Sequence, residues 1–203
     1  MRVIVGMSGA SGAILGIRTV ERLASLGVEV HLVVSKWGQV MIAQETDYSI
    51  DRVRSLAARW YKDADLGAAV SSGSFVTDGM VIVPCSARTV AALASGYGDN
   101  LLCRAADVML KERRPLVLAV REAPLSPIHL RNLLLLAEAG ATIFPPAPAF
   151  YSRPSSISEM VDYLVVRLLD QLGLHAESAN RWAGLGPTAA VPTDRDAGAG
   201  APE

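Results

Sequence analysis

Residues 2–12, Arg2-Val3-Ile4-Val5-Gly6-Met7-Ser8-Gly9-Ala10-Ser11-Gly12, join an apolar run to a glycine-rich loop. The apolar run is typical of a buried strand, and the pattern from Ala13 to Leu26 is typical of a helix. Glycines at this junction let the backbone approach an anion closely. The start of the helix offers unpaired N–H groups and the positive end of the helix dipole. The stretch therefore predicts a phosphate-bearing ligand at the first strand-to-helix junction.

The loop itself excludes two common nucleotide motifs. It lacks the Lys-Ser/Thr ending of a Walker loop, and its glycines are spaced by three rather than as GxGxxG. The second predicted strand, Val28 to Val34, runs into Ser35-Lys36, where a nicotinamide-binding fold carries an acidic residue for the ribose. Flavin mononucleotide (FMN), which has one phosphate and no second ribose, fits this pattern better than NAD.

The composition favours a single apolar domain that assembles further. The chain has 203 residues, 51% of them hydrophobic, and a formal net charge of −1. This length favours one domain with a sizeable core, and so apolar a chain often buries further surface in an oligomer. The charge does not suggest nucleic-acid binding, and no apolar run is long enough to span a bilayer.

The N-terminus, the cysteines and the histidines predict a cytoplasmic protein without a metal. Met1-Arg2 leads directly into a strand, with no signal-peptide pattern. Cys85 and Cys103 make neither a disulfide framework nor a metal site, so a reducing cytoplasm is the simplest interpretation. The three histidines are far apart in the sequence and lack ligand spacing, which argues against a metal enzyme.

Strand and helix patterns alternate along the chain. Strands are expected at residues 2–6, 29–34, 79–83, 115–120 and 141–144. Helices are expected at residues 12–26, 36–45, 86–95, 101–112, 127–139 and 156–172. This alternation predicts an α/β fold, a doubly wound, Rossmann- or flavodoxin-like parallel sheet with helices on both faces. We expect residues 1–174 to form a single domain. Residues 175–203, rich in Ala, Gly and Pro, are expected to form a tail that is flexible or packs on a neighbouring subunit.

Several polar residues lie where strands meet helices, and each has a structural and a functional interpretation. Ser86 is either the N-cap of the following helix or a ligand-binding group. Arg121 and Glu122 end the fourth predicted strand, where they form a buried ion pair or serve the ligand crevice. Lys111 is either a solvated cation at a helix end or a functional one. Glu45 ends the second helix, where a carboxylate opposes the helix dipole, which hints at a role beyond stability.

Tyr151 and Arg167 follow the last predicted strand. A proline-studded connection fixes Tyr151 at low entropic cost, and this tyrosine is either a packed aromatic with a satisfied hydroxyl or a ligand-binding group. Arg167 shares a largely apolar helix face, so it either extends to water or holds an anion. The helix that carries Arg167 is expected to open with a capping box of Ser156 and Glu159.

Taken together, the motifs of the chain resemble one known family. They are Gly6–Gly12, Ser35-Lys36, Glu45-Thr46-Asp47, Pro84-Cys85-Ser86 with Thr89, Arg104–Val108, Leu110–Val117, Arg121–Ser126, Pro145-Pro146 and Pro148–Tyr151. In this order and combination they make the chain similar to the flavin prenyltransferases of the UbiX type, formerly described as aromatic-acid decarboxylases. The resemblance covers residues 3 to about 172.

The resemblance implies a reaction and an assembly. Such enzymes bind reduced FMN and dimethylallyl monophosphate, attach the prenyl group to flavin N5 and close a ring at C6. The product, prenylated FMN, serves UbiD-type decarboxylases, and no metal is needed. Family members assemble as homo-oligomers, usually dodecamers, with their sites at subunit contacts.

The resemblance also implies roles for individual residues. The flavin-binding positions are Gly9, Ala10, Ser11, Ser35, Ser86, Ala87, Arg88, Thr89 and Arg121. The positions that grip the prenyl phosphate are Lys111, Arg121, Tyr151 and Arg167. The catalytic positions are Ser11, Glu45, Glu122 and Lys111, with Glu45 managing protons and Ser11 and Glu122 beside it.

Three further positions take their interpretation from the same resemblance. Arg104 matches a residue that helps to hold the flavin. Leu66 stands where some relatives carry a tryptophan, which removes one aromatic surface that would stabilise the prenyl cation. Trp182 matches an Arg-Trp pair near the family's C-terminus.

Two other functions share parts of this pattern. An FMN-dependent decarboxylase has the same ground plan, but such enzymes keep a histidine on the first helix, and residues 14–23 contain none. A non-catalytic flavin carrier would need the flavin loops but not Lys111, Tyr151 and Arg167 together.

Overall fold

One parallel sheet organises the part of the chain that the structure describes. The structure is a computed structural model, and it describes residues 1–175, 181 and 184. The strands are β1 (Arg2–Met7), β2 (Glu29–Val34), β3 (Arg59–Lys62), β4 (Gly79–Cys85), β5 (Leu116–Val120) and β6 (Thr142–Ile143). They lie in the order β3-β2-β1-β4-β5-β6, and every neighbouring pair is parallel.

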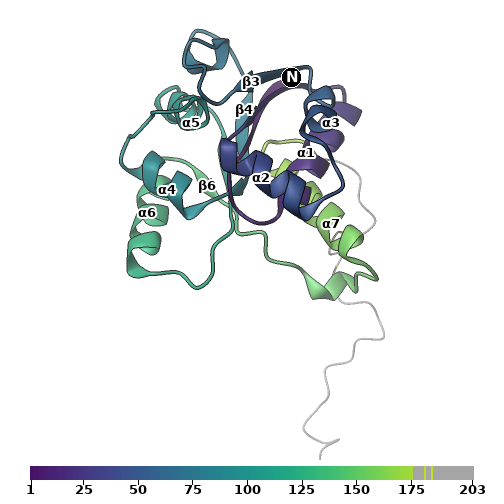
Figure 1. Cartoon of the computed structure of the whole chain (residues 1–203). Helices are drawn as coiled ribbons and strands as arrows, with labels where there is room; N and C mark the ends of the chain where they lie inside the picture. Colours follow the sequence, from purple (N-terminus) through teal and green to yellow (C-terminus); the bar gives the residue numbers. More distant parts are fainter. Residues whose placement is uncertain (176–180, 182–183, 185–203) are drawn as a thin grey trace, which may run out of the picture.

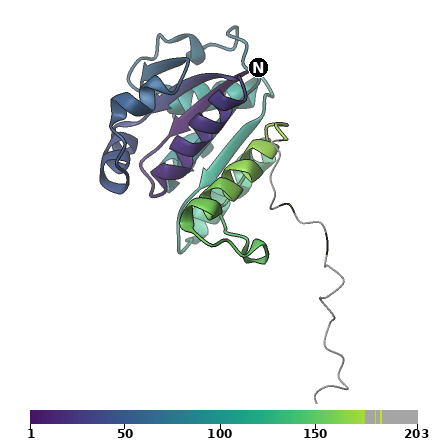
Figure 2. The ribbon, with the colours of Figure 1, turned by 90° about the vertical axis from the view of Figure 1, so that its right-hand side faces the viewer.

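Helices cover both faces of this sheet (Figure 1). The helices are α1 (Ala13–Ser25), α2 (Lys36–Glu45), α3 (Ile50–Ser55), α4 (Ala87–Ala94), α5 (Leu101–Lys111), α6 (Pro127–Glu138) and α7 (Ile157–Asp170). Apolar residues of α1, α2, α3 and α7 pack in one core cluster, and those of α4, α5 and α6 pack in the other. Figure 2 shows α1 and α7 side by side along one face.

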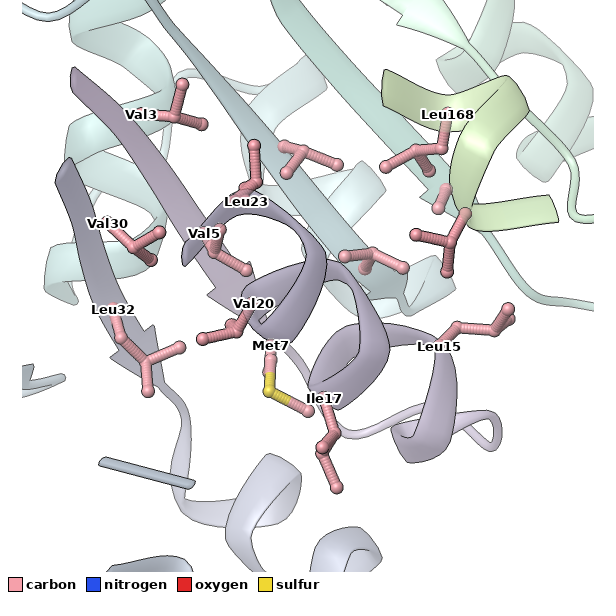
Figure 3. Packing of buried hydrophobic residues seen from close by; sticks show 14 of the residues in the cluster. Val3, Val5, Met7, Leu15, Ile17, Val20, Leu23, Val30, Leu32 and Leu168 are labelled. Carbon is pink, nitrogen blue, oxygen red and sulfur yellow. The ribbon is translucent and has the colours of Figure 1, made fainter. Parts of the chain in front are cut away.

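The alternation of side chains along β1 explains why there are two clusters. Successive residues of a strand point to opposite faces of a sheet. Val3, Val5 and Met7 are buried on the face that α1 and α7 cover, whereas Ile4 is buried on the other face. Figure 3 shows the first cluster, in which Val5 and Met7 lie beneath α1. Leu168 packs into the same cluster from α7. The continuous apolar strands are therefore those of a sheet buried on both sides, as the sequence predicts.

The strand order contains a topological switch point between β1 and β4. From β1 the chain builds outward to β2 and β3, and from β4 it builds outward in the opposite direction to β5 and β6. The loops after β1 and β4 therefore lead to helices on opposite faces, which opens a crevice at the carboxyl ends of these strands. The doubly wound α/β fold predicted from the sequence is confirmed.

The strand β3 and the helix α3 were not expected from the sequence, and the short strand expected near residues 141–144 contains only two residues. In β3, Arg59-Trp60-Tyr61-Lys62, three of the four residues are exposed, so this edge strand lacks the apolar run that marks the central strands. The short helix α3 buries only Val53. The strand expected at 141–144 is reduced to Thr142 and Ile143 at the opposite edge.

The capping box expected at the start of α7 is only half present. The Ser156 hydroxyl accepts a hydrogen bond of 3.2 Å from the Glu159 backbone N–H. The Glu159 carboxylate does not return to Ser156, because it accepts hydrogen bonds from the backbone N–H and the hydroxyl of Ser155, at 2.7 and 2.9 Å. The carboxylate therefore caps one residue earlier than predicted.

Two further sequence predictions concern a membrane-spanning helix and the C-terminal tail. No helix in the described ranges combines the length and the apolar character needed to cross a membrane. The predicted tail, residues 175–203, lies outside the described residues except for His175, Arg181 and Gly184, and so does Trp182.

Candidate active site

The loops after β2 and β4 each begin a helix with a serine cap. The Ser35 hydroxyl accepts a hydrogen bond of 3.0 Å from the Gly38 N–H at the start of α2. The Ser86 hydroxyl accepts one of 3.3 Å from the Thr89 N–H at the start of α4 and lies 3.1 Å from the Thr89 hydroxyl. Ser86 is therefore an N-cap, as one of its two interpretations states. The positive ends of two helix dipoles face the same region.

A cleft of about 530 Å³ opens between these two helix starts. This volume lies in the range of small-molecule sites, about 300–1,000 Å³. The cleft is lined by Ser8, Gly9, Ser35, Lys36, Trp37, Asp63, Ser86, Ala87, Arg88, Thr89, Ala92, Tyr97, Asp99, Asn100, Leu102, Cys103 and Glu122. Two helix N-termini, several hydroxyl groups and two nearby cations, Lys36 and Arg88, make it suitable for a phosphate-bearing ligand.

Ser8 links the loop after β1 to the end of β4 and the loop that follows it. Its hydroxyl donates a hydrogen bond of 2.9 Å to the Pro84 carbonyl and accepts one of 2.8 Å from the Ser86 N–H. The side chain is almost completely buried, with 2% of the residue exposed. Sequence reasoning did not single out Ser8, and its only signal was a small hydroxyl residue inside the glycine loop.

Gly9 is required where α2 meets the loop after β1. A Cβ on Gly9 would lie 2.3 Å from the Cβ of Trp37. Likewise, a Cβ on Gly38 would lie 2.5 Å from the Met7 carbonyl oxygen. Side chains at these two positions would push α2 away from β1 and widen the cleft.

Glu45 occupies the start of α1, where the sequence predicts a phosphate. Its Oε2 accepts hydrogen bonds of 2.8 Å from the backbone N–H groups of both Gly12 and Ala13. The expected anion at this helix start is thus a carboxylate of the chain itself. This corrects the phosphate prediction for α1 and leaves the starts of α2 and α4 for a ligand phosphate. It also explains why a carboxylate ends α2, because the side chain reaches the positive end of another helix.

The surroundings of Glu45 keep its carboxyl group ionised. Partial burial acts to raise the pKa of Glu45, but hydrogen bonds from the Ser11 side chain and from the Ala13 and Gly12 N–H groups oppose it. Together with the positive charge of Arg121, these bonds hold the pKa below its ordinary value. The structure therefore brings Ser11 to Glu45, the position expected for it, and also places the charge of Arg121 near this carboxylate. Glu122 lines the neighbouring cleft.

Lys111 lies at the other end of the sheet from Glu45. It is the last residue of α5, and its Nζ donates a hydrogen bond of 2.7 Å to Glu112. The chain then passes through the five residues of β5 before it reaches Arg121. At about 3.3 Å per residue, β5 spans about 17 Å between the backbone positions before and after it. Within one copy of the chain, Lys111 does not join the other predicted phosphate-binding residues.

Tyr151 and Arg167 lie together on a third part of the molecule. The Tyr151 hydroxyl is hydrogen-bonded to the Tyr163 hydroxyl, with the rings edge to face at 6.2 Å. Arg167 lies one turn beyond Tyr163 on α7, and its guanidinium forms an ion pair of 2.7 Å with Asp170. Neither Tyr151 nor Arg167 lines the cleft. They form a separate cluster of donors beside α7.

Three other positions lie away from the cleft lining. Arg104 donates hydrogen bonds to the Ser71 carbonyl and to Asp107, at 3.2 and 2.7 Å. Leu66 is an exposed residue in the loop after β3. Ala10 is buried next to Gly9 but is not part of the lining. Elsewhere, residues 1–175, 181 and 184 contain no group of His, Cys, Asp and Glu arranged to hold a metal ion.

The whole of this architecture is shared with known proteins. The family model described as Flavoprotein matches residues 1–169. A probable UbiX-like flavin prenyltransferase of Bacillus subtilis is 53% identical over 185 residues, which cover 91% of this chain and 91% of that protein. The flavin prenyltransferase UbiX of Archaeoglobus fulgidus is 48% identical over 182 residues, which cover 90% of this chain and 100% of that protein. The chain belongs to the UbiX-type flavin prenyltransferases.

Solved structures of flavin prenyltransferase relatives agree with this assignment. A crystal structure of AnUbiX (PadA1) in complex with FMN and dimethylallyl pyrophosphate matches with a TM-score of 0.86 and 53% identity, covering 89% of this chain and 98% of that one. A structure described as a dodecameric FMN-dependent UbiX-like decarboxylase from Escherichia coli O157:H7 matches with a TM-score of 0.89 and 50% identity, covering 91% and 100%. The cysteine decarboxylase TvaF, at 20% identity and a TM-score of 0.62, shares the fold alone.

Measured against the prenyltransferase prediction, the structure places the expected residues in four locations. The cleft contains most of the predicted flavin positions, namely Gly9, Ser35, Ser86, Ala87, Arg88 and Thr89, together with Glu122. Ser11 and Arg121 lie at Glu45. Lys111 lies at the opposite end of the strands, and Tyr151, just before α7, lies near Arg167 on α7.

Proposed function

We propose that this prenyltransferase binds reduced FMN in the cleft between α2 and α4 and transfers a dimethylallyl group from dimethylallyl monophosphate to flavin N5 and C6. The observation that carries this proposal is the pair of serine-capped helix starts that face one cleft of about 530 Å³. The relative that holds FMN and dimethylallyl pyrophosphate at 53% identity supports FMN and a dimethylallyl phosphate ester as the ligands. The family match over residues 1–169 supports a single flavoprotein domain over residues 1–174.

The residues of the cleft fit FMN. Its phosphate would accept hydrogen bonds at the starts of α2 and α4, where Ser35 and Ser86 add hydroxyl groups. Gly9 keeps the wall formed by α2 close to the β1 loop. Arg121, at the end of β5, would reach the flavin side of the site, where its charge already acts on Glu45.

The phosphate-binding cations stabilise the leaving group. Departure of phosphate from an allylic carbon leaves a cation and a phosphate whose charge grows, so donors aimed at the phosphate lower the barrier. Tyr151 would supply such a donor from the segment before α7, Arg167 from α7 and Lys111 from the end of α5. Holding the allylic carbon close to flavin N5 converts the encounter into an intramolecular reaction.

One copy of the chain does not complete this phosphate site, because Lys111 lies before the amino end of β5 and Arg121 follows its carboxyl end. We propose that neighbouring copies contribute it within a homo-oligomer of the dodecameric type. The dodecameric relative at 50% identity supports this assembly. Sites at contacts between subunits would join the cleft of one copy to the cations of others.

We propose that Glu45 accepts a proton during ring closure. Closing the ring adds a proton to the prenyl double bond and, once the C–C bond to C6 has formed, removes the proton from C6, so the site needs a group that accepts this second proton. An ionised carboxylate with a lowered pKa is such an acceptor, and the Ser11 hydroxyl is its hydrogen-bond partner. We assign Glu45 as the acceptor, Ser11 as its partner and Glu122 as the second carboxylate of the site.

The product and the compartment complete the proposal. Prenylated FMN would be passed to a UbiD-type decarboxylase. Both cysteines, Cys85 and Cys103, are buried and unpaired with each other, which fits a reducing cytoplasm. The net charge gives no support for nucleic-acid binding.

Two variants distinguish the transferase from a flavin carrier. Arg167→Ala and Tyr151→Phe should keep FMN affinity and lose prenyl transfer, because both residues lie outside the flavin cleft. FMN binding is measured by titration, and transfer by the mass of the flavin after anaerobic incubation with dimethylallyl monophosphate. Full transfer activity in both variants would remove these residues from the phosphate site. FMN binding without any transfer by the wild-type protein would favour the carrier.

A further inference from the structure

Two exposed aromatic side chains line the flavin cleft. Trp37, near the start of α2, is 59% exposed, and Tyr97, in the connection between α4 and α5, is 60% exposed. The rest of the lining is small, polar or charged apart from Leu102 and Cys103. An indole ring exposed to water is less favourable than one in contact with an apolar surface. These two rings are the planar surfaces that the described cleft residues offer to a ligand.

The backbone of Trp37 is fixed while its ring is left uncovered. The residue follows the Ser35 cap by two positions, and its Cβ packs so tightly on Gly9 that no side chain fits there. Within the described part of the chain, no ring stacking or cation–π contact involves the Trp37 indole. The Cβ of Trp37 is therefore held by packing, whereas its indole ring is left exposed.

Trp60 provides a comparison within the same molecule. It is 42% exposed on β3, and the guanidinium of Arg54 lies 4.2 Å from its ring centroid. It lines a neighbouring cleft of about 350 Å³ and not the flavin cleft. Trp60 already has a partner within the chain, whereas Trp37 faces the flavin site.

We propose that Trp37 is a flavin-positioning residue, whose indole stacks on the planar ring system of FMN in this cleft, with Tyr97 as the second aromatic wall. The inference rests on the proposed function, because it takes FMN as the ligand of the cleft. The serine-capped helix starts hold the polar end of the ligand, and the uncovered indole holds its planar end. Offset stacking of two aromatic systems fixes the ring without constraining its edges, where the reaction takes place.

The test uses Trp37→Phe and Trp37→Ala, with Trp60→Phe as the matched control. Both changes at position 37 retain the Cβ that packs on Gly9, so they remove the indole and leave the wall in place. An indole in contact with an oxidised flavin quenches the emission of the flavin by electron transfer after excitation. We expect saturated FMN to be brighter in Trp37→Phe than in the wild type and unchanged in Trp60→Phe. Trp37→Ala should bind FMN about tenfold more weakly, from the strength of one aromatic contact.

Each outcome decides the proposal. Brighter flavin and weaker FMN binding in the Trp37 variants, with the assembly size of the wild type in gel filtration, support it. Unchanged emission and an unchanged dissociation constant overturn it while the FMN site stands. Altered assembly without altered FMN binding also overturns it, since Trp37 would then belong to a subunit contact. Failure of the wild type to bind FMN overturns both the proposed function and this inference.

Discussion

The Glu45→Gln substitution tests how one carboxylate contributes to stability and to catalysis. The change removes the charge at the start of α1 and keeps the shape of the side chain. Glu45 accepts two backbone hydrogen bonds of 2.8 Å. An anion at an exposed helix start contributes about 0.3–1 kcal/mol, and a charged acceptor strengthens each hydrogen bond. Because Glu45 is largely exposed and screened by solvent, we expect the free energy of unfolding at pH 7 to fall by about 1 kcal/mol.

This stability difference should depend on pH in a defined direction. The pKa of Glu45 in the folded chain lies below its ordinary value of 4.5. The stabilising charge is therefore complete above that ordinary value and is lost as the pH falls through the folded pKa. In urea denaturation, the difference between wild type and Glu45→Gln should stay constant from about pH 7 to about pH 5 and shrink at lower pH. A difference that keeps its full size in acid would contradict the electrostatic explanation.

The catalytic effect of the same substitution should be much larger. Loss of a general base typically costs a factor of about 10²–10⁴, so we expect prenyl transfer to fall at least about a hundredfold while FMN still binds. Glu159→Gln is the matched control, because Glu159 also has a lowered pKa and caps a helix start, at Ser155. It should cost similar stability and leave transfer unchanged. Transfer by Glu45→Gln within tenfold of the wild type would refute the role of Glu45 as proton acceptor.

Other substitutions test the walls of the cleft and the contribution of neighbouring subunits. Gly9→Ala places a Cβ 2.3 Å from that of Trp37, so FMN should bind at least about tenfold more weakly in a titration. An unchanged affinity would mean that α2 shifts without altering the FMN site. Ser8→Ala leaves the Ser86 N–H without its 2.8 Å acceptor and should lower the free energy of unfolding by about 1–3 kcal/mol in urea; wild-type stability would show that this link is dispensable. Lys111→Ala and Arg167→Ala should each be inactive alone. Mixed oligomers made by coexpression should regain part of the transfer activity, and no recovery would argue that one copy supplies both cations.

The central strands of the sheet could be predicted from local sequence patterns, whereas the edge strand β3 could not. The β1 run and its glycine loop are marked by apolar continuity and by turn chemistry, which act within a few residues. Residues 59–62 of β3 lie at the sheet edge, where only one neighbour is needed and exposed side chains are tolerated. Pairing with β2, which no local pattern encodes, makes this segment a strand.

The site was predictable in its residue types but not in its arrangement. The cleft residues Ser35 and Ser86 were found because they follow strands. The destination of the Glu45 side chain was not, because its partners lie 32 and 33 residues away in the chain, at the start of α1 on the same face of the sheet. The predicted strand at 115–120 already separates Lys111 from Arg121, whereas the resemblance assigns both residues to one phosphate site. Trp37 carried no motif, and its exposure in the cleft is visible only in three dimensions.

The most direct test of the proposed function is the mass of the flavin that the purified protein releases. The protein is incubated without oxygen with reduced FMN and dimethylallyl monophosphate and is then denatured for mass spectrometry. The prenyltransferase account predicts a flavin heavier by one C5 prenyl unit. Unchanged FMN, released from protein that both ligands saturate, would contradict it.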